Sequence, residues 1–63
     1  MAFAAVVART SPQGMEYLVR ETGRAEWGSV AQQAARFQNL REATRAALRL
    51  PSGLRAFALP AEA

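Results

Sequence analysis

Three arginines are the clearest candidates for contact with another molecule. Arg41, Arg45 and Arg49 recur at every fourth position, and this spacing places them on one side of a helix. Such a stripe can bind a phosphate backbone or an acidic protein surface. The alternative is a solvated outer face whose charge Glu42 partly offsets. Because like charges four residues apart slightly destabilise a helix, their repetition favours a role in binding.

Bond-making chemistry has few candidates in this chain. The sequence contains no His, Cys, Asp or Lys, so the usual bases, nucleophile pairs and zinc ligands are missing. The serines stand at predicted turns or caps, and the glycines are isolated rather than grouped in a phosphate-binding loop. We therefore expect no enzymatic activity, no catalytic residue, no metal site and no cofactor.

The length and charge of the chain limit its organisation. Sixty-three residues form one small domain, 1–63, with an ordered core at about 3–59. So short a chain buries a modest core and depends on good packing, a partner or a homodimer. The net charge of +3 permits an acidic partner. The apolar start, residues 1–8, is too short for a membrane span and lacks a basic leader, so we expect a cytoplasmic protein with no membrane contact.

A β-hairpin is predicted at the start of the chain. Residues 3–10 are small or β-branched and predict a strand, and residues 15–21 predict a second strand. The intervening Ser-Pro-Gln-Gly, residues 11–14, is typical of a turn. We expect Thr10 to lie opposite Met15 in this hairpin.

This pairing sorts the side chains of the hairpin onto two faces. We expect the core to lie on the first face, which carries Ala4, Val6, Ala8, Met15, Tyr17 and Val19. The second face carries Arg9, Glu16 and Arg20 together with an apolar patch of Phe3, Val7 and Leu18. That patch is predicted to be exposed and to bind a partner or a second copy. A one-residue slip would exchange the two faces.

Two helices and a third strand are predicted next. Ser29 and Gln32 fit a capping box for a helix over 30–35, and Asn39 and Glu42 fit another for a helix over 40–49. Pro51 ends this helix, and residues 54–59 predict a strand. The result is an α+β fold, β-β-α-α-β. It has a three-stranded, mainly antiparallel sheet with one or two short helices on one face.

The spacing of several residues resembles that of small phage and prophage proteins. Trp27, the Ala34-x-x-Phe37 step and the Glu42-Ala43 pair fall where these proteins have a Trp, an A-x-x-F step and the start of a capped helix. The resemblance covers about residues 6–48. It implies a hairpin-and-helix fold and a phage origin, and it brings no catalytic residue. The chain departs from the pattern at residues 29–30, where acidic residues are frequent in that family.

Three functions are consistent with these features. The first is a non-enzymatic protein-binding module, such as a phage-encoded inhibitor of a host or defence protein, since small phage proteins often bind and block a host protein. The second is a basic accessory protein that binds nucleic acid through its arginine stripe. The third is a structural homo-oligomer that associates through the patch around Val7 and Leu18.

Overall fold

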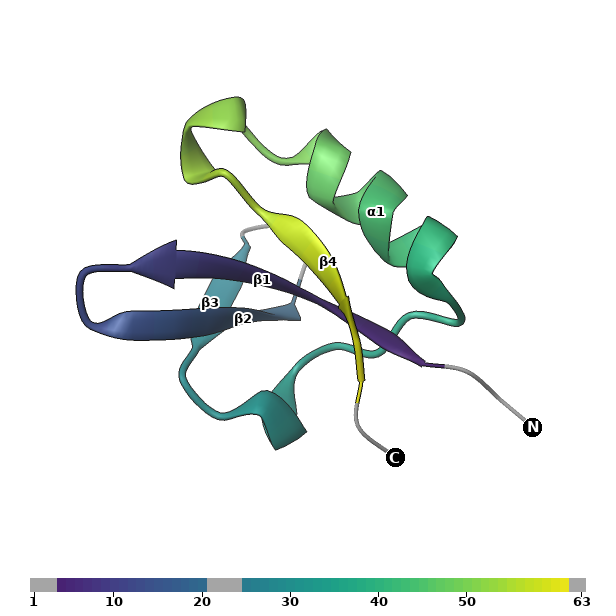
Figure 1. Cartoon of the computed structure of the whole chain (residues 1–63), viewed down its shortest axis with the longest axis horizontal. Coiled ribbons are helices and arrows are strands. Elements are labelled where there is room, and N and C mark those ends of the chain that lie inside the picture. The colour runs from purple at the N-terminus through teal and green to yellow at the C-terminus, as the bar shows by residue number, and fades with distance from the viewer. Residues whose placement is uncertain (1–3, 21–24, 62–63) are drawn as a thin grey trace.

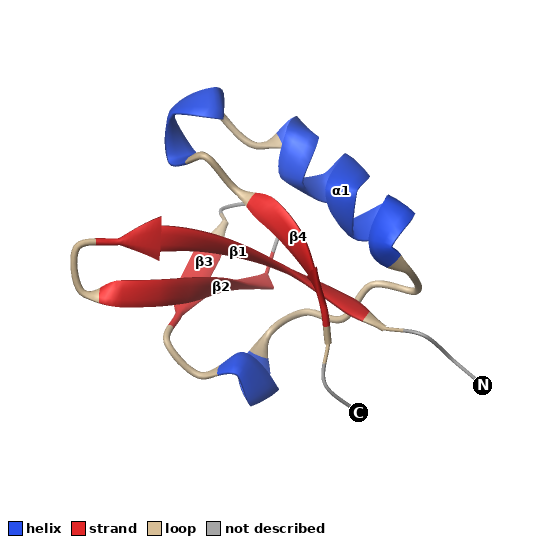
Figure 2. Ribbon diagram, in the orientation of Figure 1, coloured by secondary structure: helices blue, strands red, loops and turns tan. Residues whose placement is uncertain are grey.

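The computed structural model describes residues 4–20 and 25–61. Four strands form one antiparallel sheet in the order β3-β2-β1-β4, with one helix and two short 3-10 turns beside it (Figures 1 and 2). The elements are β1 (Ala5–Ser11), β2 (Gly14–Arg20), β3 (Glu26–Gly28), η1 (Ala31–Gln33), α1 (Leu40–Arg49), η2 (Ser52–Leu54) and β4 (Phe57–Pro60). The predicted α+β class with an antiparallel sheet is confirmed. The number of strands, the first predicted helix and the predicted core face differ, and the strand predicted over 54–59 spans Phe57–Pro60 instead.

The first change is an additional strand, which makes the sheet four-stranded rather than three-stranded. Trp27 lies opposite Leu18 in the ladder between β2 and β3. The run of three residues in β3 is shorter than a typical strand, so alternation along the sequence gives little indication of it. The predicted turn at 22–24 and the predicted end of the second strand at Glu21 lie outside the described residues.

The second change is that the predicted helix over 30–35 is wrong. Only residues Ala31–Gln33 form a 3-10 turn, and its N-cap is Val30, with no side-chain cap. The helical ladder does not continue because the N–H of Ala35 donates to the carbonyl of Leu18 in β2, at 2.9 Å. A bond to the sheet therefore replaces the next bond within the helix.

The hairpin register is confirmed. Thr10 lies opposite Met15, and the ladder extends one pair further, to Ser11 and Gly14. The turn is thus two residues shorter than expected. The Ser11 hydroxyl donates to the Gly14 carbonyl at 2.8 Å and accepts from the N–H of Gln13 at 3.3 Å. Gly14 has a φ of 122°, a conformation that a side chain would strain.

The chain segment 35–37 lies between β1 and β2 where these strands diverge. Ala35 bonds to β2 as described above, and Phe37 exchanges two backbone hydrogen bonds with Ala5 of β1, at 3.0 and 2.8 Å. The segment connects η1, on one side of the sheet, to α1 on the other (Figure 1). These bonds attach the backbone on both sides of Arg36 to the sheet.

The core lies between α1 and the face of the sheet that carries Val7 and Leu18, here called the helix-covered face. Both side chains are fully buried and pack with Ala43, Ala46 and Ala47 of α1. Alanines let a helix approach a sheet closely, so the small side chains of α1 are sufficient to shield this face from water. The predicted exposed patch of Val7 and Leu18 is therefore wrong, and Phe3 lies outside the described residues.

The charged residues of this face explain why the sequence favoured the other one. Arg9 and Glu16 alternate with Val7 and Leu18, which suggested an exposed surface. In the structure the Arg9 guanidinium contacts Glu16 at 2.8 Å and lies 4.4 Å from the centre of the Trp27 ring. This pairing and stacking lets both side chains lie half-buried beside the core without an unpaired buried charge.

Helix α1 has the predicted bounds and the predicted cap. The Asn39 side chain accepts a hydrogen bond from the N–H of Glu42 at 2.9 Å, which satisfies one of the free donors at the helix start. Leu50 ends the helix before Pro51. The connection to β4 then turns through η2 and through Arg55, whose φ of 55° is left-handed.

Strand β4 is an edge strand that pairs only with β1 within the described sheet. The N–H of Ala61 donates to the carbonyl of Ala4 at 2.9 Å, so residues 57, 59 and 61 direct their backbone groups to β1. Ala58 and Pro60 direct theirs outward. Within residues 4–20 and 25–61, no helix has the length and apolar character needed to cross a membrane.

Candidate functional site

The sheet face opposite α1, here called the open face, carries larger side chains than the helix-covered face. Alternation and register place Val6, Ala8, Met15, Tyr17, Phe57 and Leu59 on it. Val6 and Ala8 are buried, Tyr17 and Leu59 are half-buried, and Met15 is exposed. No helix covers this face within the described residues, and only the short turn η1 lies against part of it (Figure 1).

A groove of about 710 Å³ lies between the open face and η1. Its floor comes from β1, β2 and β4, and its wall comes from η1 and the segment that follows. The volume lies in the range of natural ligand sites. The residues of this open-face groove are Val6, Tyr17, Ala31, Gln32, Arg36, Leu59, Pro60 and Ala61.

Three polar side chains line the open-face groove: Tyr17, Gln32 and Arg36. None of them makes a side-chain hydrogen bond or an ion pair with another described residue. A phenol, a primary amide and a guanidinium are all hydrogen-bond donors. The groove thus combines an apolar floor with donors that are available to a bound molecule.

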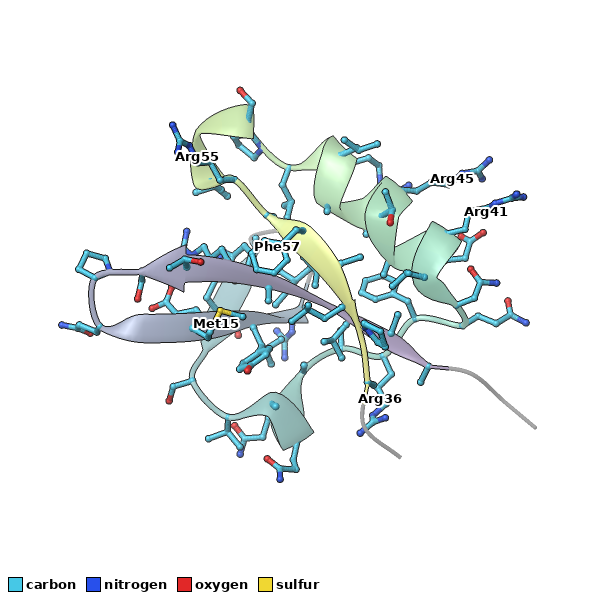
Figure 3. All side chains as sticks on the ribbon, in the orientation of Figure 1. Met15, Arg36, Arg41, Arg45, Arg55 and Phe57 are labelled. Atoms are coloured by element: carbon cyan, nitrogen blue, oxygen red, sulfur yellow. The ribbon has the colours of Figure 1, made fainter. Side chains whose placement is uncertain are left out.

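The three arginines of the predicted stripe lie on the outer side of α1, as the sequence indicated. Arg41, Arg45 and Arg49 are exposed, and Figure 3 shows Arg41 and Arg45 projecting away from the sheet. Leu48, 79% exposed, lies among them on the helix surface. We call Arg41, Arg45, Leu48 and Arg49 the α1 ridge. No described acidic group lies within ion-pair distance of Arg41 or Arg45.

Other arginines of the sheet have acidic partners. Arg9 pairs with Glu16, and Arg20 approaches Glu26 at 3.8 Å in an exposed pair. Exposed pairs of this kind contribute little to stability. Among the described residues, the arginines without an acidic partner are therefore Arg41 and Arg45 of the α1 ridge, Arg36 and Arg55.

The sequence predicts one of the two candidate surfaces. It predicted the α1 ridge through Arg41, Arg45 and Arg49, but it missed the open-face groove. The alternation of the hairpin favours Val6 and Tyr17 as core residues, and the capping pattern favours a helix at Gln32. One signal was available for Arg36: its neighbour Phe37 is the better core residue, which leaves the charged side chain for the surface.

Comparisons with models of known protein families, with curated protein sequences and with solved structures each gave no match. The candidate sites therefore rest on the geometry of this chain alone.

Within the described residues, no group of three or more His, Cys, Asp or Glu side chains is placed to hold a metal ion.

Proposed function

We propose that this chain is a non-enzymatic binding domain that contacts a protein partner through the open-face groove. The observation that supports the proposal is the groove itself, with its apolar floor and its three donor side chains that have no partner among the described residues. Binding sites typically combine a concave apolar surface with a few polar groups that fix the orientation of the bound molecule.

The lining of the groove favours binding over catalysis. Its described residues include no carboxylate, imidazole or thiol side chain, the groups that most often serve as general bases or nucleophiles. Its apolar residues can remove water from a bound segment, and its donors can orient that segment. These are the properties of a contact surface.

The resemblance to small phage proteins gives the proposal a specific form, an inhibitor that covers a surface of a host or defence protein. Such inhibition requires a sufficiently large and tight contact surface, and it requires no catalytic residues. A stable complex buries roughly 800 Å² on each partner, and this domain exposes 4740 Å² in total. The contact would therefore extend beyond the groove to exposed apolar neighbours such as Met15 and Val30.

The test is affinity capture from a lysate of cells that carry the gene, with a variant that fills the groove. Ala31 is exposed and lines the groove, so Ala31→Tyr should obstruct it while the fold is retained. Ser52, exposed in η2 and outside the groove lining, gives the matched control Ser52→Tyr. We expect one specific partner to be retained by the parent chain and by Ser52→Tyr, and lost with Ala31→Tyr. Equal retention by all three chains would refute the proposal.

Nucleic-acid binding is the second candidate, and the α1 ridge is the observation that favours it. Two of its arginines, Arg41 and Arg45, are exposed without a described acidic partner. Arginines along one helix side can contact successive phosphates of a backbone. Leu48 in their midst weakens this proposal, because an exposed apolar side chain fits a protein surface better than a phosphate backbone.

A mobility-shift assay with duplex and single-stranded DNA tests the second candidate. Replacing Arg41 and Arg45 by Gln should weaken binding for every sequence and reduce the salt dependence by about one unit of slope for each lost phosphate contact. The control is Arg36→Gln, which removes an exposed charge from the other side of the sheet. If the double variant binds as tightly as the parent, the α1 ridge does not bind nucleic acid.

A further inference from the structure

We infer that Arg36 anchors an acidic side chain of the partner in the open-face groove. The occupant is a peptide segment of another protein in which an Asp or Glu stands beside an apolar residue. This inference rests on the proposed function and deepens it, since it states the chemistry of the segment that the groove recognises.

The first argument is that hydrogen bonds attach the backbone on both sides of Arg36 to the sheet. The residues on either side of it are bonded to the sheet: Ala35 to Leu18 at 2.9 Å, and Phe37 to Ala5 at 3.0 and 2.8 Å. Phe37 packs against the core, whereas Arg36 is exposed and lines the open-face groove. Figure 3 shows it on the other side of the sheet from Arg41 and Arg45.

The second argument is that the guanidinium of Arg36 has no counter-charge among the described residues. It makes no ion pair with any of them, and those that line the groove include no acidic residue. Arg9 and Arg20, by contrast, each lie beside a glutamate on the sheet. A carboxylate is the group that matches a guanidinium best, since two parallel hydrogen bonds can form. Tyr17 and Gln32 add further donors in the same groove.

The third argument is the apolar floor, which a carboxylate alone would not cover. Val6 and Leu59 lie opposite each other in the β1–β4 ladder, and both line the groove beside the Tyr17 ring. Burying an apolar side chain here would supply affinity, and the Arg36 contact would fix its orientation. The groove of about 710 Å³ has room for a few side chains, which suits a short peptide segment.

A second copy of this chain is the less suitable occupant. A symmetric dimer through the groove would bring two Arg36 side chains towards each other, on chains that each carry a net charge of +3. The repulsion between these like charges opposes self-association, whereas an acidic partner is attracted. The charge of the groove therefore favours a different, acidic protein.

The experiment is parallel selection from one displayed library of random 12-residue peptides, at physiological salt. The targets are the parent chain, Arg36→Gln and Arg45→Gln. The last variant removes the same charge from the α1 ridge, so it controls for general attraction of acidic peptides to a basic protein. Circular dichroism checks that each target is folded, which we expect because both arginines are exposed.

Peptides selected by the parent and by Arg45→Gln should be enriched in an acidic residue next to an apolar one. Peptides selected by Arg36→Gln should keep the apolar enrichment and lose the acidic one. A peptide selected on the parent should bind Arg36→Gln about 5- to 10-fold more weakly, and should shift the amide NMR signals of Val6, Tyr17 and Leu59.

Two outcomes would overturn the inference, and they differ in what they say of the proposed function. If the parent selects apolar peptides without acidic enrichment, or if Arg36→Gln selects the same acidic peptides, Arg36 is not the anchor, while the groove still binds peptides. If no selected peptide is blocked by Ala31→Tyr, the groove is not a peptide-binding site, and the inference and the proposed function fail together.

Discussion

The two faces of the sheet differ in how they are filled. The helix-covered face buries Val7 and Leu18 completely beneath the alanines of α1, whereas the open face leaves Tyr17, Phe57 and Leu59 half-exposed and keeps a groove. Small side chains on the helix allow close packing, and large side chains without a helix leave apolar surface for an external partner. Apolar content alone therefore does not identify the core. Which face becomes the core depends on whether another element can pack its side chains against that face.

The largest expected effect would come from a cavity in the helix-covered face. Leu18→Ala should lower the free energy of unfolding by about 2.5–4 kcal/mol. Leu18 is fully buried, so its truncation leaves a cavity that neither water nor a neighbouring side chain fills. The control on the open face is Met15→Ala, whose side chain is exposed and should cost about 0.5 kcal/mol. Urea unfolding measures both values, and similar losses for the two variants would show that the faces are not distinct.

The second prediction concerns the close approach of α1 to the sheet. Ala43 has no exposed surface, so Ala43→Leu should overfill the interface and destabilise the fold by about 1–3 kcal/mol. The same change on the other side of the sheet, Ala31→Leu at an exposed position, should stay within about 0.5 kcal/mol of the parent. Thermal unfolding followed by circular dichroism compares them. A neutral Ala43→Leu would indicate that α1 packs loosely.

The third prediction tests how far the helix start supports the helix-covered face. Asn39→Ala removes the acceptor of the Glu42 N–H and should cost about 1 kcal/mol in unfolding free energy. Asn39→Asp keeps a side-chain oxygen at the cap and should retain most of the stability. Equal stability of the parent and of Asn39→Ala would mean that packing alone fixes the start of α1.

The smallest expected effect concerns the connection from α1 to β4. Arg55 adopts a left-handed conformation that costs a residue with a Cβ about 1–2 kcal/mol. Arg55→Gly should relieve this cost, partly offset by the greater freedom of glycine in the unfolded chain, for a net gain of about 0.5 kcal/mol. Arg55→Ala keeps the strained backbone and serves as the control. A loss of stability in Arg55→Gly would show that the arginine side chain itself stabilises the turn.

The sequence predicted those elements whose signals are local. The register of the hairpin, the Asn39 cap and the bounds of α1 follow from turn residues, pairing and capping, and all are found in the structure. The outward position of Arg41, Arg45 and Arg49 followed from helical spacing in the same way.

What the sequence did not predict depends on contacts between distant residues. The wrong face was predicted as the core because the charges of Arg9 and Glu16 suggested an exposed surface. In the structure Arg9 contacts Glu16 and the Trp27 ring, and these three residues belong to three different strands. The predicted helix over 30–35 does not form, since the N–H of Ala35 bonds to the carbonyl of Leu18. No local sequence pattern predicts this bond between distant residues. The open-face groove depends on both of these features, so the sequence did not predict it.

Pro60 limits edge-to-edge association of a domain that also exposes an apolar sheet face. An edge strand with free donors can recruit the same strand of a neighbouring molecule and start a cross-β stack. At Pro60 the backbone nitrogen directed away from β1 carries no hydrogen, and Ala58 is the other residue of the short strand β4 that faces outward. The molecule can thus keep a surface suited to recognition while the β4 border of its sheet resists fibre growth.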